Sequence, residues 1–350
     1  MPAPATRAQP RTRTLDGVGK VDAAFCTTSC HQDVGAEWRG SLHQQAWKDP
    51  IFLKAYELEP VAFCRGCHAP EGNPEDVLPS LRAQDAGVSC TTCHVEAGRV
   101  QGAHPQVGAP HPFRLAPGLG GEGACVTCHQ FDFPKQARQT SPSPMQDTVA
   151  EWRASSFAST SCQDCHMPLV GEGDKRHRSH DFRVIGDPNI LKEALIVSAT
   201  RPSDERVVLS LASGKVGHAF PTGDMFRRLE VRAFAIDGSG RVLASAKPVE
   251  LARTFRDVPR DPDSKTDLSH QRIEVSDTRL GPPGTKNAER TVALTLPAAA
   301  AKGARVRWEV AYQRMMHPLA ESFGVNPLED ETLLASGVID AIRPPPPAPR

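Results

Sequence analysis

The chain has 350 residues with 41 basic and 41 acidic side chains, so its formal net charge is zero and its pI is near 7.2. This length suits two domains of about 150 residues. The balanced charge argues against a nucleic-acid-binding protein, which is normally basic. No run of about 18 apolar residues occurs, so we expect no transmembrane span.

Residues 1–20 are rich in proline and arginine and contain little apolar sequence. They lack the apolar stretch of a recognisable signal peptide. We expect them to form a disordered N-terminal arm.

All ten cysteines fall in five pairs, and a histidine follows each pair at once. The five motifs are Cys26-Cys30-His31, which has one extra residue between its cysteines, Cys64-Cys67-His68, Cys90-Cys93-His94, Cys125-Cys128-His129 and Cys162-Cys165-His166. This pattern is typical of c-type haem attachment, in which two thiols bond to the haem vinyl groups and the histidine binds the iron. Zinc sites and disulfides also use paired cysteines. Neither explains a histidine after every pair, so we expect five covalent haem c groups, the first being the less regular.

Covalent haem attachment takes place after export of the polypeptide. We therefore expect a periplasmic or extracellular protein, although the printed N-terminus shows no leader sequence.

Residues 21–186 hold all five motifs, separated by short helical pieces and many proline and glycine residues. We expect an α-helical, loop-rich multihaem cytochrome c domain here. Its clearest predicted helix covers residues 35–49, where Trp38, Leu42 and Ala46 stand four apart. This segment begins a partial repeat: EWRGSLH at residues 37–43 matches EWRASSF at residues 151–157, with Phe157 in place of His43.

Residues 187–342 contain no cysteine and show alternating apolar and polar side chains. The alternation predicts strands near residues 194–199, 207–211, 229–235, 241–246, 292–296, 305–312 and 332–338. About seven short strands separated by turns are typical of an all-β antiparallel sandwich domain. Residues 343–350 hold five prolines and read as a Pro-rich tail.

Several segments beyond the haem motifs carry a family resemblance. They are the EWxxSxH segment, Cys165-His166-Met167-Pro168, Ser179-His180-Asp181-Phe182 and the Gly217–Gly223 loop. Over about residues 21–240 the chain resembles multihaem c-type cytochromes, and in particular the tetrahaem electron carriers related to hydroxylamine oxidoreductase. The resemblance implies electron transfer at low potential through closely packed, mostly bis-histidine haems. The chain departs from it in the long first motif and in Phe157.

Eight histidines remain as candidates for the second axial position of an iron. Imidazole keeps a c-type haem six-coordinate and low in potential. We expect the distal ligands to be His43, His104, His111, His180 and His218. His177 is an alternative to His180, whereas His270 and His317 are expected to be solvated. The Gly217–Gly223 loop is either a plain turn or a clasp that presents His218, and we favour the clasp.

Two functions fit these observations. One is an electron carrier that relays electrons between a redox-protein donor and acceptor. The other is an oxidoreductase that acts on a small nitrogen or sulfur oxyanion at a five-coordinate haem. The supply of spare histidines favours the carrier, so no catalytic residue is predicted. The sequence names no partner and no oligomeric state.

Overall fold

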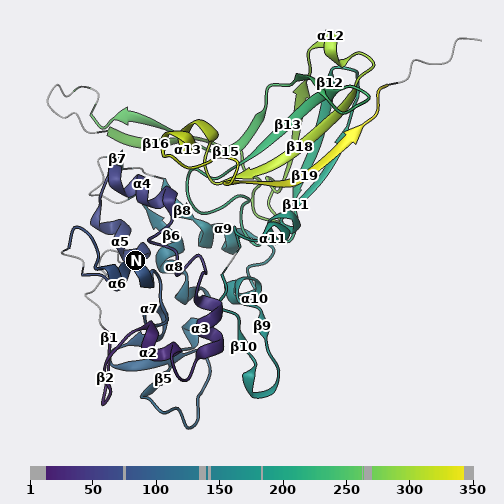
Figure 1. Ribbon diagram of the computed structural model, residues 1–350. Coiled ribbons are helices and arrows are strands. Elements are labelled where there is room, and N and C mark those ends of the chain that lie inside the picture. Colours follow the sequence, from purple (N-terminus) through teal and green to yellow (C-terminus); the bar gives the residue numbers. More distant parts are fainter. Residues whose placement is uncertain are drawn as a thin grey trace, which may run out of the picture. The chain divides into compact units, whose positions relative to one another are not determined.

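The computed structural model describes residues 13–73, 76–133, 139–140, 143–182, 184–261, 263 and 270–342. The chain divides into two compact units (Figure 1). The haem-motif unit comprises Met1–Val149, Ser159–Val184 and Asp257–Arg272; the β unit comprises Ala150–Ala158, Ile185–Arg256 and Ile273–Arg350. The domains expected from the sequence meet at a single boundary between residues 186 and 187. The two units differ from them, because each unit includes short segments from the other half of the sequence.

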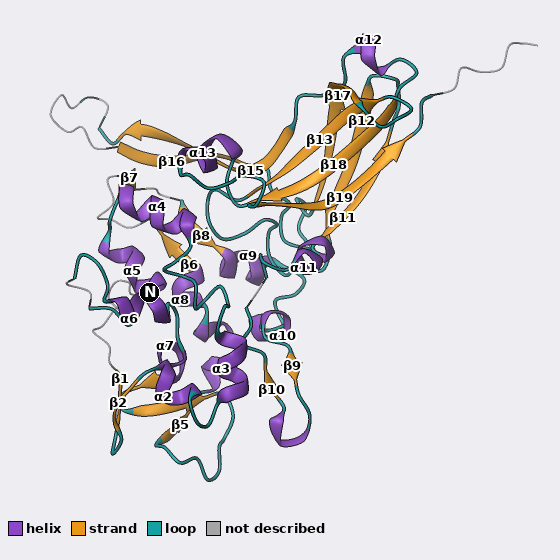
Figure 2. Cartoon of the chain, in the orientation of Figure 1, coloured by secondary structure: helices purple, strands orange, loops and turns teal. Residues whose placement is uncertain are grey.

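The haem-motif unit consists of short helices joined by loops and small sheets (Figure 2). Its α-helices are α2 (Ala23–Thr27), α3 (Gln32–Trp38), α4 (Pro50–Leu58), α5 (Ala62–His68), α6 (Leu81–Ala86), α7 (Cys90–His94), α8 (Val126–His129) and α10 (Cys162–His166). Helix α9 (Thr148–Ala154) continues into the β unit, and 3-10 turns cover Pro117–Gly120, Glu122–Ala124 and Gly173–Lys175. Side-chain caps begin several helices: Asp49 accepts from the Phe52 N–H at 3.0 Å, and Ser89 caps α7.

The strands of this unit form small sheets. The pairs are β1 (Arg13–Leu15) with β2 (Gly19–Val21), β6 (Gln130–Asp132) with β8 (Pro144–Asp147), and β9 (Leu169–Val170) with β10 (His177–Arg178). Strands β3 (Val95–Glu96), β4 (Arg99–Gly102) and β5 (Phe113–Leu115) form a three-stranded sheet. Strand β7 (Gln139–Thr140) pairs in parallel with His270 and Gln271.

The prediction of a disordered arm over residues 1–20 is wrong for its second part. Residues 13–21 form the β1–β2 hairpin, and Leu15 and Val21 are buried in a small cluster with Val95. Burial of these two apolar side chains stabilises the hairpin. Residues 1–12 lie outside the described residues.

The predicted helix over residues 35–49 is also corrected. Helix α3 ends at Trp38, and Gly40 adopts a left-handed backbone with φ of 84°. Such a backbone breaks an α-helix. Residues 42–48 form turns, and His43 lies on one of them.

The β unit contains all seven strands expected from the alternation. They are β11 (Leu195–Thr200), β12 (Arg206–Ser213), β13 (Arg228–Ile236), β14 (Val242–Ser245), β17 (Glu289–Thr295), β18 (Arg305–Gln313) and β19 (Glu331–Ile339). Strands β15 (Val249–Pro259) and β16 (His270–Asp277) were not expected, and part of each belongs to the haem-motif unit. The short helices are α11 (Pro188–Glu193), α12 (Ala298–Ala301) and α13 (His317–Ser322).

Two antiparallel sheets share one hydrophobic core in this unit. One has the order β11-β12-β17, and the other contains β19-β18-β13-β15-β16 with β14 paired to β13 (Figure 1). Alternate residues of β12 and β13 turn inward, so that Leu209 of one sheet and Leu229 of the other are fully buried in the same cluster. Burial of these side chains is the main stabilising term for the unit. Among the described residues, no helix is long and apolar enough to cross a membrane.

Candidate haem-binding site

The five cysteine-histidine motifs all lie in the haem-motif unit, four of them on a short helix that ends at the motif histidine. These four helices are α5, α7, α8 and α10. One helical turn brings the two thiols to the same side, next to the histidine. All ten cysteines lie within the described residues, and none of them forms a disulfide.

The first motif has a different local structure. Helix α2 ends at Thr27, Cys30 lies in the turn that follows, and His31 is the N-cap residue of α3. The His31 N–H donates to the Cys26 carbonyl at 3.1 Å, and the Cys30 side chain is exposed. The extra residue of this motif is therefore accommodated in a turn, with its cysteines and histidine still close together.

Thiols of different motifs are direct neighbours. Hydrogen bonds join Cys26 to Cys90, Cys67 to Cys128, and Cys125 to Cys162. The bond to Cys125 lowers the pKa of Cys162 to about 7, while the same bond raises the pKa of Cys125. The first motif thus adjoins the third, the second adjoins the fourth, and the fourth adjoins the fifth.

Two pairs of histidine rings have the spacing of axial ligands. The ring centroids of His43 and His129 are 6.4 Å apart, and those of His94 and His180 are 6.2 Å apart. Two imidazoles bound in line to one metal ion, with bonds of about 2.0 Å, have centroids about 6 Å apart. In each pair one histidine belongs to a motif and the other is a predicted distal ligand.

Backbone carbonyls hold the Nδ1 atoms of several of these rings. Nδ1 lies 2.9 Å from the Gln101 oxygen in His94, 2.8 Å from the Arg178 oxygen in His180 and 2.6 Å from the Ala46 oxygen in His68. A histidine whose Nδ1–H donates to a carbonyl presents Nε2 as the metal ligand. Nε2 is then the nitrogen through which each of these rings would bind a metal ion.

Burial and neighbouring charges lower the pKa values of His43 and His180. Desolvation, and after it the neighbouring His129 and His180, lower the pKa of His43 to about 3. Desolvation and His94 also lower the pKa of His180. Neutral imidazoles are the form that binds a metal.

His111 is a further ligand candidate near the first motif. Desolvation, followed by the charge of His111, lowers the pKa of His31, so His111 lies within electrostatic reach of His31. The Nδ1 atom of His111 is buried and has no hydrogen-bond partner in the described part of the chain. Buried polar atoms without a partner are rare in folded proteins, so this atom is a candidate donor to a bound group.

The other predicted ligands differ in their surroundings. His104 is exposed, and its side chain makes no hydrogen bond or ring contact with the described residues. His177, the alternative to His180, instead contacts Glu37, with 3.1 Å between Nε2 and Oε1. His270 is exposed as expected, but His317 is partly buried and lies 3.0 Å from the Glu331 carboxylate.

Phe182 lies between the two ring pairs, and sequence reasoning did not single it out as a separate feature. Its ring centroid is 4.2 Å from that of His43 and 5.9 Å from that of His180. Its backbone is left-handed, with φ of 48°, which is costly for a large side chain. The only sequence signal was its place in the Ser179–Phe182 segment.

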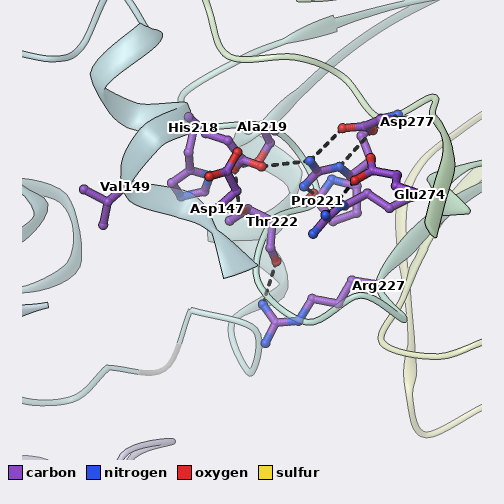
Figure 3. Close-up of polar contacts among 12 residues, drawn as sticks. Asp147, Val149, His218, Ala219, Pro221, Thr222, Arg227, Glu274 and Asp277 are labelled. Atoms are coloured by element: carbon purple, nitrogen blue, oxygen red, sulfur yellow. Dashed lines mark hydrogen bonds and ion pairs between the residues drawn. The ribbon is translucent and has the colours of Figure 1, made fainter. Parts of the chain in front are cut away.

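His218 belongs to the β unit, on a loop held by charged side chains (Figure 3). Its Nδ1 lies 2.9 Å from the Ala219 oxygen, and burial lowers its pKa. Arg279 donates to the Pro221 carbonyl at 2.9 Å, and Arg227 donates to the Thr222 carbonyl at 2.9 Å. The loop is therefore fixed at two successive carbonyls.

These residues fit haem c, for which the porphyrin supplies four nitrogen ligands and the protein needs to supply only two. The described residues contain no group of three or more histidine, cysteine or acidic side chains arranged to hold a metal ion by themselves.

Two comparisons with known proteins find similar chains. Residues 25–95 match the family model "Cytochrome c554 and c-prime". The crystal structure of a penta-heme cytochrome c552 from Thermochromatium tepidum matches with a TM-score of 0.67 and 22% sequence identity, over 91% of this chain and 98% of that one. The matches support a multihaem c-type cytochrome. A search of the curated proteins found no match.

Proposed function

We propose that the protein is an electron-transfer cytochrome that carries five covalent haem c groups and relays electrons between redox-protein partners. The observation that carries this proposal is the spacing of the His43–His129 and His94–His180 rings, which suits two iron sites closed on both sides by imidazole. When bound, haem c supplies a one-electron iron couple. A closed site favours electron transfer over substrate binding.

The proposed axial pairs are His129 with His43 and His94 with His180. His31 with His111 is a third proposed pair, supported by the effect of His111 on the pKa of His31 and by the orphaned Nδ1 atom of His111. His68 and His166 are the remaining proximal ligands, and His104 and His218 remain proposed distal ligands. Phe52 stacks on His68 with centroids 3.5 Å apart and an angle of 4°, which fixes the plane of the His68 ring.

The thiol contacts support a continuous relay. They place motif one beside motif three, motif two beside motif four, and motif four beside motif five. Cys93 also lies near Cys125, which joins the third motif to the fourth. Every attachment site thus has at least one neighbouring site, as an electron relay needs.

Three further assignments belong to the same proposal. A periplasmic or extracellular location follows from the chemistry of haem attachment. The relationship to hydroxylamine oxidoreductase rests on the sequence segments named above. A sandwich arrangement of the β unit is supported by the core that its two sheets share.

The test is a redox titration of the purified holoprotein, followed by optical spectra and mixing with a reduced donor protein. We expect five one-electron steps and rapid reoxidation by an acceptor protein, without consumption of nitrite, hydroxylamine or sulfite. If one of these compounds reoxidises the reduced protein and is consumed in a matching amount, the oxidoreductase is supported instead.

A further inference from the structure

The partial repeat contains a glutamate that haem attachment does not explain. The first residue of the repeat is Glu37 in α3 and Glu151 in α9. Neither residue is part of a cysteine-histidine motif, yet each holds a loop that carries a predicted distal ligand.

Glu37 binds the segment that carries His180. Its Oε2 atom accepts a hydrogen bond from the His180 main-chain N–H at 2.8 Å. Its Oε1 atom lies 3.1 Å from Nε2 of His177, and a backbone bond to Lys175, followed by Glu37, raises the pKa of His177. One carboxylate therefore holds two points of the chain, three residues apart.

Glu151 makes the corresponding contacts in the β unit. Its Oε2 atom accepts from the Thr222 hydroxyl at 2.6 Å, and its Oε1 atom accepts from Arg279 at 2.8 Å. Arg279 in turn binds the Pro221 carbonyl. The loop held in this way is the one that carries His218, and the Glu151 side chain is only 7% exposed.

We infer that Glu37 is a positioning residue for a distal haem ligand: its carboxylate holds the His180 backbone so that the imidazole faces His94. In the second copy of the repeat, Glu151 holds the loop that carries His218. This parallel argues against a chance contact of Glu37 in the first copy.

The local structure around His180 explains why its backbone needs a side-chain contact to fix it. Residues 179–182 lie in neither a helix nor a strand, so no ladder of backbone bonds fixes them. The His180 ring is held at Nδ1 by the Arg178 carbonyl, and its main chain is held by Glu37. With both restraints the ring direction is set before the metal binds, which is the usual role of residues behind a metal ligand.

This inference rests on the proposed role of His180, so the test includes that residue. Holoproteins with Glu37→Ala, Glu37→Gln, His180→Ala and the control Glu57→Ala are compared by electron paramagnetic resonance, intact mass and thermal unfolding. Glu57 is an exposed residue of α4 that pairs with Lys54. Glutamine keeps an oxygen that accepts from the His180 N–H, whereas alanine does not.

We expect all four variants to keep the parent haem count. His180→Ala should convert about one fifth of the low-spin signal to high spin, because one of five irons loses its imidazole. Glu37→Ala should show part of the same conversion, reversed by added imidazole, while Glu37→Gln and Glu57→Ala should resemble the parent.

Three results would overturn the inference or its basis, and they are distinguishable. If His180→Ala leaves the spectrum unchanged, the ligand assignment itself fails. If His180→Ala changes the spectrum and Glu37→Ala does not, only the positioning role fails. If Glu37→Ala lowers the unfolding temperature or haem count without a high-spin signal that imidazole reverses, Glu37 is structural and does not position the ligand.

Discussion

The ring of Phe182 packs against the ring of His43, with centroids 4.2 Å apart and an interplanar angle of 54°. The same ring lies edge-on to His180. Phe182 thus contacts the distal candidates of two different proposed iron sites, and it does so from a left-handed backbone. The ring contacts offset the cost of that backbone.

Replacing Phe182 by glycine separates these two effects. Loss of the ring costs about 3 kcal/mol, whereas relief of the left-handed backbone returns about 1 kcal/mol. We therefore expect Phe182→Gly to lower the free energy of unfolding by about 2 kcal/mol. Denaturant unfolding followed by near-ultraviolet circular dichroism measures the change.

Ala97 is the matched control, because it has the same φ of 48° and an exposed side chain. Ala97→Gly removes backbone strain with almost no loss of packing, so it should stabilise the protein by about 0.5–1 kcal/mol. A Phe182→Gly variant as stable as the parent would mean that the ring contacts contribute no more than the left-handed backbone costs.

Five covalent haems are expected on each chain. The mass of the intact holoprotein should exceed the 37.8 kDa polypeptide by five haem groups. The double variant Cys26→Ala, Cys30→Ala should lose one haem and keep four. A parent protein with only four haems would show that the first motif, with Cys30 in a turn, is not used.

The second motif should contribute to folding as well as to redox activity. Cys64 packs against buried Trp47, Tyr56 and Ala69, so its haem would adjoin this small apolar cluster. Cys64→Ala or Cys67→Ala should remove that haem, expose the cluster and weaken the near-ultraviolet circular dichroism. A variant with the parent dichroism and one haem fewer would show that the cluster packs without it.

The sequence predicts best those features in which each residue has its own local signal. The alternation of apolar and polar residues locates β12, β13 and β18. Prediction from the sequence missed β15 and β16, because charged residues there, such as Arg253 and Glu274, face partners rather than solvent and the apolar–polar alternation is weak. It extended a helix past Trp38 because side-chain spacing takes no account of the backbone at Gly40.

Pairing of the histidines is a different problem. His43 and His129 are 86 positions apart, and the sequence shows only that His43 is a spare imidazole. Its partner depends on how α8 and the turn after α3 meet, which is a tertiary property. Glu37 likewise has no local signal, since its partners at His177 and His180 are about 140 positions away.

Stability of the β unit should fall in acid because of Glu331. Burial opposes its ionisation, but hydrogen bonds from Arg232 and Gln313 and the charge of Arg232 outweigh burial and lower its pKa. A depressed pKa contributes stability above the unfolded value, about 4.3 for glutamate, and the contribution is lost as the pH falls through the folded value. The Glu331 carboxylate accepts from Arg232 and Gln313 and lies 3.0 Å from His317, and Glu230 binds the same Arg232 and Gln313.

Glu331→Gln should lower stability by about 1–3 kcal/mol at neutral pH, and stability should then fall less steeply between about pH 5 and pH 3. Thermal unfolding at a series of pH values measures both effects. Glu321→Gln, on the exposed side of α13, is the control. An unchanged pH profile in Glu331→Gln would exclude this carboxylate as a source of acid sensitivity.

The last prediction concerns the iron sites as a set. In the second copy of the repeat Phe157 stands where the first copy has His43, so this copy supplies no imidazole at that position. The β unit places another histidine nearby: a Cβ at Gly217 would lie 3.5 Å from the Phe157 side chain, so the loop that carries His218 packs against Phe157. Glu151 and Arg279 hold that loop. The chain thus keeps a histidine beside the altered position, which a pure electron carrier requires if no iron is to remain open to stray ligands.

We therefore expect all five ferric haems to be six-coordinate and low-spin, with His43 and His180 among the distal ligands. Electron paramagnetic resonance of the oxidised protein tests this expectation. His43→Ala should convert about one fifth of the signal to high spin, while His270→Ala, at an exposed histidine, should change nothing. A stoichiometric high-spin signal in the parent protein that shifts on addition of nitrite, hydroxylamine or cyanide would contradict the carrier, because it would reveal an iron open to substrate.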